Sequence, residues 1–260
     1  MKIGVIGTGA IGTFLLHAVN EQRRIPTARI TAIHSRRYEQ TQRLAQKYNT
    51  EAYETVEQIL QSDVDVIIEA ATGDVVKMIA EEVFQHKKHL IVSSIGAFVD
   101  ETYLRKIEAI ASRAQRHLYC PSGAIGGLDV IRAAKTSNTL QRVALTTRKP
   151  PIALQGEIKE ATVLFQGQAK EAITQFPQNM NVAIALSLAG LCLVQTEVCV
   201  ISDPTVTKNH HKIEAYGLFG TMTFEIENNP LPSNPKTSAL AAYSLLATIQ
   251  SMTSTVVVGS

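Results

Sequence analysis

Three glycines near the start of the sequence have a spacing that suits phosphate binding. Gly7, Gly9 and Gly12 follow an apolar run at residues 3–6 and precede apolar residues at helical intervals. In this spacing the first glycine allows a tight turn, the second lets a pyrophosphate approach the backbone, and the third lets the helix pack on the strand. Glycine turns also occur without a ligand, but the strand before and the helix after favour dinucleotide binding, since a helix start offers N–H groups to phosphates. The residues expected to contact the dinucleotide here are Gly7, Gly9, Ala10, Ile11 and Gly12.

The turn after the second expected strand, at residues 34–37, contains no acidic residue. Sites specific for NAD usually place Asp or Glu at this turn to hold the ribose 2′-hydroxyl. The hydroxyl of Ser35 and the guanidinium of Arg36 suit a 2′-phosphate instead, through charge-assisted hydrogen bonds. The alternative is that Arg36 and Arg37 are simply solvated. We assign Ser35 and Arg36 to the cofactor site and expect NADP to be used at least as well as NAD.

Two adjacent histidines, His210 and His211, lie in the densest polar segment of the second half, which runs from Asp203 to Glu214. Imidazole titrates near neutrality and therefore suits proton transfer in a dehydrogenase. If the segment is a strand, the two rings point to opposite faces and only one faces a cleft. The spacing is equally compatible with a solvated loop before a strand. A metal site is not expected, because adjacent histidines rarely chelate one ion and no carboxylate–histidine pair supports them.

Two further polar pairs are candidates for ligand binding. Asn179 and Asn181 precede an apolar segment, where an amide either holds a nicotinamide carboxamide or a substrate carboxylate, or caps the helix that follows. Arg148 and Lys149 end an expected strand before two prolines. They either pair with a carboxylate or are surface charges at a turn.

Strand-like and helix-like segments alternate over the first 120 residues. The expected strands are 3–6, 28–33, 64–70, 89–92 and 117–120, and the expected helices after the first are 37–48, 74–86 and 100–114. This alternation predicts βαβ units in a parallel sheet covered by helices. Ligands bind such sheets at the carboxyl ends of the strands, here residues 7–12, 34–37, 69–73 and 93–96.

The pattern changes at a glycine-rich segment, residues 120–128, that reads as a hinge or a second ligand-facing loop. Beyond a short helix at 128–134, the expected strands are 143–147, 162–166, 198–202, 213–216 and 221–226, with helices near 170–176 and 182–193. This order predicts an α+β domain with a mixed or antiparallel sheet. Three prolines at 230, 232 and 235 indicate a linker, and a final helix at 237–250 is expected to return to the first domain. The fold class is therefore an α/β protein, with a Rossmann-type parallel-sheet domain and a second α+β domain.

Composition narrows the functional classes. A net charge of +2 over 260 residues, without a basic patch, argues against nucleic acid and membrane surfaces as partners. The cysteines at 120, 192 and 199 form no CxxC pair and are expected to be buried thiols in a reducing compartment. Because Met1 and Lys2 lead directly into a strand, no signal peptide is expected. The most apolar stretch, 182–194, is too short to span a bilayer. The expected location is the cytoplasm.

Taken together, these segments resemble the L-aspartate dehydrogenase family, over essentially the whole chain. The nucleotide loop is generic, whereas the central Pro-Ser-Gly-Ala-Ile-Gly-Gly loop, the Phe-Pro-x-Asn-x-Asn-Val-Ala segment and the Asn-x-His segment, in this order, are specific. The segments that carry the resemblance are 7–12, 69–71, 121–129, 147–151, 176–183, 203–204, 209–213 and 234–238.

The resemblance implies a two-domain enzyme. A dinucleotide-binding domain would comprise 1–119 plus 234–260, and a catalytic and dimerisation domain would comprise 120–233. Such enzymes oxidise L-aspartate with NAD or NADP to iminoaspartate, which hydrolyses to oxaloacetate and ammonia and can feed NAD synthesis. A homodimer is the assembly implied.

The resemblance also implies roles for individual residues. The catalytic histidine would be His211, because it lies two positions after Asn209, although His210 beside it leaves a one-residue ambiguity. The family's dinucleotide contacts fall on Ala124 and Asn181, and we assign Ala70 and Ala71 to the cofactor as well. The nicotinamide would lie near Ala124 and take a hydride from the substrate Cα while His211 accepts a proton. The residues expected to bind the substrate are Ser122, Gly123, Asn179 and Arg148.

Two alternatives stay open at this stage. The first is an imine reductase similar to dihydrodipicolinate reductase, although its His-His-x-x-Lys spacing is absent, since Lys212 follows His211 directly. The second is a non-enzymatic dinucleotide-sensing protein, which would need an appended interaction segment.

Overall fold

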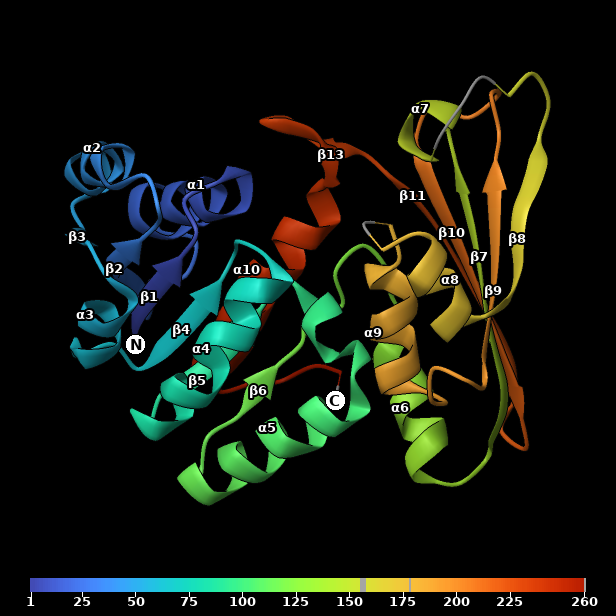
Figure 1. The fold of residues 1–260 in the computed structure, drawn as a ribbon. Coiled ribbons are helices and arrows are strands. Elements are labelled where there is room, and N and C mark those ends of the chain that lie inside the picture. The colour runs from blue at the N-terminus through green and yellow to red at the C-terminus, as the bar shows by residue number, and fades with distance from the viewer. Residues whose placement is uncertain (155–157, 178, 260) are drawn as a thin grey trace. The chain divides into compact units, whose positions relative to one another are not determined.

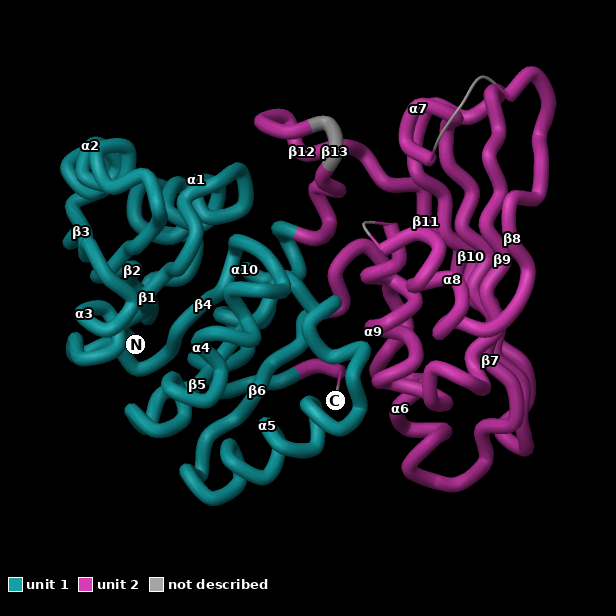
Figure 2. The backbone as a smooth tube through the Cα atoms, viewed as in Figure 1, with its two compact units in different colours: residues 1–121, 242–257 teal, residues 122–241, 258–260 magenta. Residues whose placement is uncertain are grey.

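The chain folds into two compact units, shown in different colours in Figure 2. The computed structural model describes residues 1–154, 158–177 and 179–259, except for the side chains of 235 and 236. Unit 1 comprises Met1–Pro121 with Ala242–Val257, and unit 2 comprises Ser122–Ala241 with the last residues of the chain.

Unit 1 is built on a six-stranded sheet in the order β3-β2-β1-β4-β5-β6, in which all neighbours are parallel. The central strands β1, β4 and β5 are apolar runs buried on both faces, as the covered position of a parallel sheet requires. The strand order reverses beside β1, which lies between β2 and β4, and this switch point is where such sheets bind ligands. The strands are β1 (Lys2–Ile6), β2 (Arg29–His34), β3 (Glu51–Tyr53), β4 (Val66–Glu69), β5 (His89–Val92) and β6 (Leu118–Tyr119).

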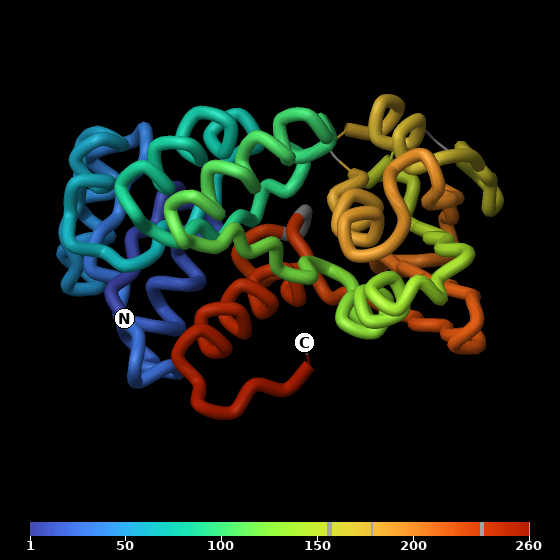
Figure 3. The backbone as a smooth tube through the Cα atoms, turned by 90° about the horizontal axis from the view of Figure 1, so that it is seen from below, coloured from blue at the N-terminus to red at the C-terminus, as the bar shows by residue number. Residues whose placement is uncertain are grey.

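Helices cover both faces of this sheet. In Figure 3, α1 (Ala10–Leu16) and α10 (Ala239–Thr253) lie on one side, with α4 (Gly73–Gln85) and α5 (Glu101–Ala114) on the other. Leu245 and Ile249 of α10 join the core formed by β1, β2 and α1, so the predicted return of the last helix is confirmed. The remaining helical elements are η1 (His17–Glu21), α2 (Tyr38–Tyr48), α3 (Val56–Gln61) and η2 (Ile95–Val99).

Unit 2 is built on a five-stranded sheet in the order β11-β10-β7-β9-β8. Only the β7–β9 pair is parallel, so the sheet is mixed, and the predicted fold class is confirmed. Burial alternates along its strands, because α6 (Leu128–Thr136), α8 (Ala169–Gln175) and α9 (Asn181–Ala189) cover one face (Figure 1). The strands are β7 (Leu140–Lys149), β8 (Thr162–Gln168), β9 (Thr196–Ser202), β10 (Asn209–Gly217) and β11 (Gly220–Asn228), and α7 (Pro151–Leu154) follows β7.

The prolines after β11 do not form a linker. β12 (Pro230–Leu231) and β13 (Asn234–Ser238) pair as a short hairpin, and Ser238 donates a hydrogen bond to Asn228 at 2.6 Å. The chain therefore returns to unit 1 at Ala242 rather than at residue 234, and the first division falls after Pro121 rather than after 119.

The expectation of three buried thiols is wrong. Cys192 is exposed in the turn that follows α9, and Cys120 and Cys199 are half-buried; all three are free. In the part of the chain that the structure describes, no helix has the length and hydropathy that a bilayer span requires.

Candidate active site

The glycine loop after β1 has the geometry that its spacing predicts. Gly7 has φ +111°, and a Cβ there would lie 2.4 Å from the carbonyl oxygen of Ala70. A Cβ at Gly12 would lie 2.0 Å from the carbonyl oxygen of Gly7, so both positions exclude a side chain. A Cβ at Gly9 would meet nothing within 4 Å. The backbone at Gly9 is therefore open to a ligand, while the other two glycines hold the turn and the helix in place.

The start of α1 faces the same loop. Gly9 is the N-cap and supplies no side-chain acceptor, so the first N–H groups of the helix, at Ala10 and Ile11, are left for a ligand. The loop after β4 closes against it, because Ala70 donates its N–H to the carbonyl of Ile6 at 2.8 Å. These residues fit the diphosphate of a dinucleotide.

The turn after β2 is held by a chain of hydroxyl groups. Thr8 donates to Ser35 at 2.9 Å, Ser35 and Thr41 share a hydrogen bond of 2.7 Å, and Thr41 donates to the carbonyl of Arg37. The Ser35 hydroxyl is thus fixed at the end of β2, and the side chains of Arg36 and Arg37 are exposed beside it. No ion pair engages either arginine within the described residues, which leaves both guanidinium groups free for a phosphate or for water.

A buried carboxylate joins two loops at the same sheet edge. Glu69, fully buried at the end of β4, accepts hydrogen bonds from the Ala71 N–H at 2.6 Å and from the Ser94 hydroxyl and N–H at 2.8 and 3.0 Å. Burial raises the pKa of the Glu69 carboxyl above its usual range, and these hydrogen bonds oppose the shift. Glu69 therefore fixes the Ala70–Ala71 turn that packs against Gly7.

In unit 2, His211 lies inside β10 and not in a loop, so the solvated-loop interpretation is wrong. Its ring is buried on the helix-covered face, 3% exposed, and its Nδ1 shares a hydrogen bond of 3.1 Å with Thr147 Oγ1 on β7. Burial, followed by the charges of Lys149 and His210, lowers the pKa of His211 to about 3. His210 points to the opposite face, 4.0 Å from Glu225, as alternation along a strand requires.

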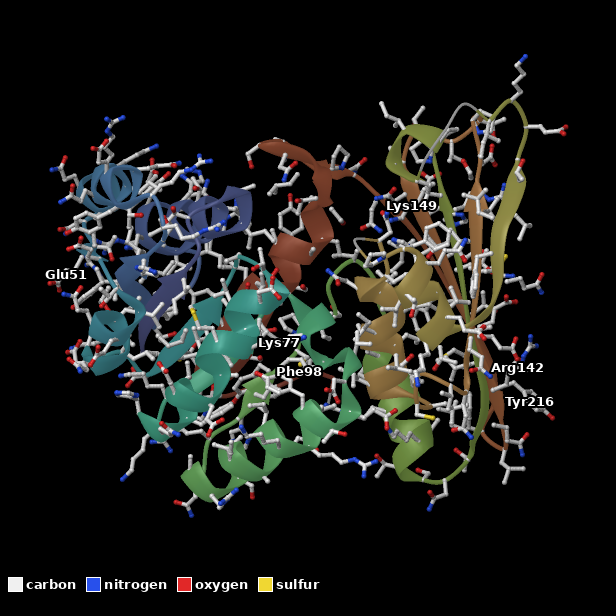
Figure 4. The ribbon with its side chains drawn as sticks, in the orientation of Figure 1. Glu51, Lys77, Phe98, Arg142, Lys149 and Tyr216 are labelled. Atoms are coloured by element: carbon white, nitrogen blue, oxygen red, sulfur yellow. The ribbon has the colours of Figure 1, made fainter. Side chains whose placement is uncertain are left out.

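A buried lysine lies near His211. Lys149 is 6% exposed, and its Nζ donates to Asn179 Oδ1 at 2.8 Å. Burial lowers the pKa of Lys149 from 10.5 to about 8. In Figure 4, Lys149 lies toward one end of the sheet, away from Arg142 and Tyr216 at the other.

Models of two known protein domains together match most of the chain. Residues 7–121 match the model of the homoserine dehydrogenase NAD-binding domain, and residues 129–252 match that of the aspartate dehydrogenase C-terminal domain. An L-aspartate dehydrogenase of Methanosarcina barkeri is 37% identical, with all of both chains covered.

The chain belongs to the L-aspartate dehydrogenase family. An L-aspartate dehydrogenase of Nitrosopumilus maritimus is also 37% identical, over 96% of this chain and 95% of its own. The crystal structure of aspartate dehydrogenase from Thermotoga maritima superposes with a TM-score of 0.82 at 28% identity, covering 100% of this chain and 99% of that one. A myo-inositol dehydrogenase of Lactobacillus casei, at 12% identity and a TM-score of 0.60, covering 96% of this chain and 84% of its own, shares the fold alone.

Against this family background, the structure does not bring Arg148 together with His211. Arg148 lies directly opposite His210 in the register of β7 and β10, so both side chains lie on the outer face of the sheet. There Arg148 forms an ion pair with Asp203. Asp203 is committed further, since it accepts two hydrogen bonds from Thr205. Of the two basic residues at the end of β7, the one on the His211 face is Lys149.

Two asparagines expected in the family site are placed differently. Neither caps α9, because the N-cap is Met180 and no side chain caps that helix, so the capping alternative is wrong. Asn181 is exposed in the first turn of α9, whereas Asn179 accepts the hydrogen bond from Lys149.

The central loop depends on a residue that the sequence did not indicate. Asn228, buried at the end of β11, donates from Nδ2 to the carbonyl of Ala124 at 3.0 Å. Gly127 ends the loop with φ +76°, and a Cβ there would lie 2.5 Å from the Phe224 ring. The path of residues 122–127, which includes Ser122 and Gly123, is thus fixed against β11. Among all the residues that the structure describes, no group of three or more His, Cys, Asp or Glu side chains could hold a metal ion.

Proposed function

We propose that this protein oxidises L-aspartate with NAD or NADP to iminoaspartate, which water converts to oxaloacetate and ammonia. The observation that carries the proposal is a buried histidine with one ring nitrogen anchored to Thr147 and a lysine beside it. This arrangement combines a proton acceptor with a cation for a carboxylate, which are the two groups that oxidation of an acidic amino acid requires.

The residues that we assign to the cofactor fall into two groups. The glycine loop with Ala10 and Ile11 would hold the diphosphate, and Ser35 with Arg36 would hold the adenosine ribose. Ala70 and Ala71, at the neighbouring sheet edge, would also contact the cofactor. We assign Ala124 and Asn181 to the nicotinamide end. When bound, NAD or NADP supplies the acceptor for the hydride that leaves the substrate Cα.

His211 would take the proton released from the substrate ammonium. Burial and the charge of Lys149 lower the pKa of His211 to about 3, so the ring is neutral in the free protein, and a substrate carboxylate beside Lys149 would raise that pKa and make the ring a better base. If Nδ1–H donates to Thr147, the lone pair lies on Nε2, which has no hydrogen bond within the described residues. Thr147 would then fix both the tautomer and the ring plane.

The substrate would be held beside this ring by the central loop and by an amide. We assign Ser122 and Gly123 to the α-carboxylate, and we assign Asn179, which accepts the hydrogen bond from Lys149, to the substrate as well. Holding both reactants in one geometry lowers the barrier, because their translational freedom is already lost on binding. After His211 has released that proton to solvent, the neutral ring would activate the water that hydrolyses the imine.

The test is an assay of the purified protein with both cofactors. L-Aspartate with NAD or NADP, and oxaloacetate with ammonia and the reduced cofactor, should both give turnover, whereas L-malate should not. Activity with dihydrodipicolinate alone would establish the imine reductase instead. Tight dinucleotide binding without turnover of any of these compounds would favour the sensing protein.

We also propose a homodimer in the cytoplasm and a supply of iminoaspartate to NAD synthesis, on the strength of the family resemblance. Sedimentation and the growth of a strain that depends on this enzyme for NAD would test the two points.

A further inference from the structure

Lys149 is a buried cation for which the described residues provide no counter-charge. Its ammonium has one partner among the described residues, the neutral amide oxygen of Asn179. No carboxylate of the described chain forms an ion pair with it, and no other Lys or Arg lies on the helix-covered face of the sheet. A charge removed from water is strongly unfavourable unless an opposite charge approaches it. The environment of Lys149 therefore indicates that an anion binds next to its ammonium group.

A second observation at the same place is independent of the charge. Ser202 is fully buried at the end of β9, and its Oγ has no hydrogen-bond partner among the residues that the structure describes. The β7–β9 register pairs Lys149 directly with Ser202, so both side chains leave the sheet on the same face. Buried hydroxyl groups are nearly always hydrogen-bonded, and an unsatisfied one next to an uncompensated cation indicates a missing acceptor.

We propose that Lys149 and Ser202 bind the side-chain carboxylate of the substrate and so select a dicarboxylic amino acid. This inference rests on the proposed function, which it deepens. The Lys149 ammonium and the Ser202 hydroxyl would each donate to the carboxylate. Asn179, whose oxygen already accepts from Lys149, would have its amide Nδ2 available as a third donor.

The assignment to the side-chain carboxylate follows from what the rest of the site offers. Every amino acid carries an α-carboxylate, so a group that binds only that one gives no preference for aspartate. The central loop, residues 122–127, carries no charged side chain, so the α-carboxylate that we assign to it would be bound without a cation. A desolvated cation next to the proton acceptor His211 is the feature that would distinguish aspartate from a neutral amino acid of equal size.

Direct binding tests the site without turnover. Succinate and butyrate have equal length and differ by one carboxylate, and calorimetry on the protein saturated with reduced cofactor gives their dissociation constants. Succinate should bind roughly 10–100-fold more tightly than butyrate. Lys149→Met should abolish that preference and Ser202→Ala should reduce it several-fold, with cofactor binding retained as the check on folding. Lys212→Met, a lysine beside His211 on the opposite face, should behave like the parent.

Kinetics then separate the two carboxylates. L-2-Aminobutyrate replaces the side-chain carboxylate of aspartate with a methyl group, so Lys149→Met should lower kcat/KM for aspartate and leave that for 2-aminobutyrate almost unchanged. An equal loss for both substrates would place Lys149 on the α-carboxylate and overturn the inference. An unchanged succinate preference in Lys149→Met would overturn it as well. Because succinate binding needs no chemistry, a parent that binds succinate through Lys149 but leaves aspartate unoxidised would contradict the proposed function and keep the site.

Discussion

At the scale of single residues, Lys149 and His211 show how burial controls charge. Each is removed from water on the same sheet face, and each has its pKa lowered, because burial disfavours the charged form. The positive charge of Lys149 is one of the reasons why His211 is a weak base in the free protein. A substrate carboxylate beside Lys149 would offset that charge and raise the pKa of His211. Substrate binding would thereby make the histidine a better proton acceptor.

The first prediction is that Lys149→Met stabilises the protein that it inactivates. A pKa of about 8 instead of 10.5 means that holding the ammonium charged destabilises the folded state at neutral pH, on the order of 3 kcal/mol. Loss of the hydrogen bond to Asn179 offsets about 1 kcal/mol of this. Between the two pKa values the unfolded chain binds more protons, so the parent gains stability as pH rises and the difference between the proteins shrinks. Denaturant unfolding near pH 7 and near pH 10 measures both effects; a variant less stable than the parent near pH 7 would contradict them.

The second prediction concerns Ser35→Asp and cofactor choice. A carboxylate at this turn would still accept the hydrogen bond from Thr8, so the turn should persist, while its charge repels a 2′-phosphate and offers an acceptor to the ribose. We expect the ratio of kcat/KM for NADP to that for NAD to fall roughly tenfold to hundredfold. Arg36→Ala should weaken NADP use and spare NAD. If the parent uses only NAD and Arg36→Ala changes nothing, the arginines face only water.

At the scale of elements, the sequence predicts the boundaries of a strand or helix well wherever its apolar pattern is long. The strands β1, β4 and β5 begin and end close to their predicted positions, because their residues are buried on both faces of the sheet. The long helices of unit 1 do so because each buries only one face and therefore has a clear apolar period. β3 and α3 were not predicted, since three half-exposed residues and a single short helix leave little periodicity; the capping box of Thr55 and Gln58 was the available signal. β10 starts at Asn209 rather than 213, because pairing with β7 and β11 makes polar residues part of the strand.

Only part of the candidate site could be predicted from the sequence. The alternation of Val143, Leu145, Thr147 and Lys149 would have placed Lys149, and not Arg148, on the inner face. By contrast, the contact between Thr147 and His211 depends on strand order and register, and Asn228 contacts Ala124 across 104 positions. Neither relation leaves a trace in local spacing.

The third prediction tests that long-range contact. Asn228→Ala removes the donor to Ala124 and the acceptor for Ser238, which should free the central loop. Because the loop is assigned to the nicotinamide end, the dissociation constant for the reduced cofactor should rise roughly tenfold, about what one or two hydrogen bonds contribute. Cofactor fluorescence measures it. The control is Glu225→Ala, which changes a side chain on the outer face of the same strand. Equal affinities for the reduced cofactor in all three proteins would mean that the central loop does not contact the cofactor.

At the scale of the whole molecule, the chain leaves unit 1 after Pro121 and comes back at Ala242 to complete its core. Unit 1 is therefore discontinuous, and α10 contributes Leu245 and Ile249 to the core that supports β1 and the glycine loop. The loop that would bind the dinucleotide thus depends on both ends of the chain. We therefore expect stability and cofactor binding in unit 1 to depend on residues more than 230 positions away from the glycine loop.

The fourth prediction follows from that coupling. Leu245→Ala leaves a cavity in the unit 1 core and should lower the free energy of unfolding by about 2–5 kcal/mol, with weaker cofactor binding. Gln250→Ala, exposed on the same helix, should change stability by less than about 0.5 kcal/mol. Chemical denaturation of the three proteins gives both values. A Leu245→Ala protein as stable as the parent would mean that α10 is dispensable for unit 1.

We propose above that His211, on the inner face of β10, accepts the substrate proton. The most direct measurement is the rate at which reduced cofactor forms in a single turnover with L-aspartate, for the parent, His211→Ala and His210→Ala. His211→Ala should be slower by about 10²–10⁴-fold while it binds cofactor and succinate like the parent, because a positioned acid–base group contributes that much. His210→Ala should stay close to the parent rate, since its ring lies on the outer face near Glu225. An inactive His210→Ala beside a fully active His211→Ala would contradict the account.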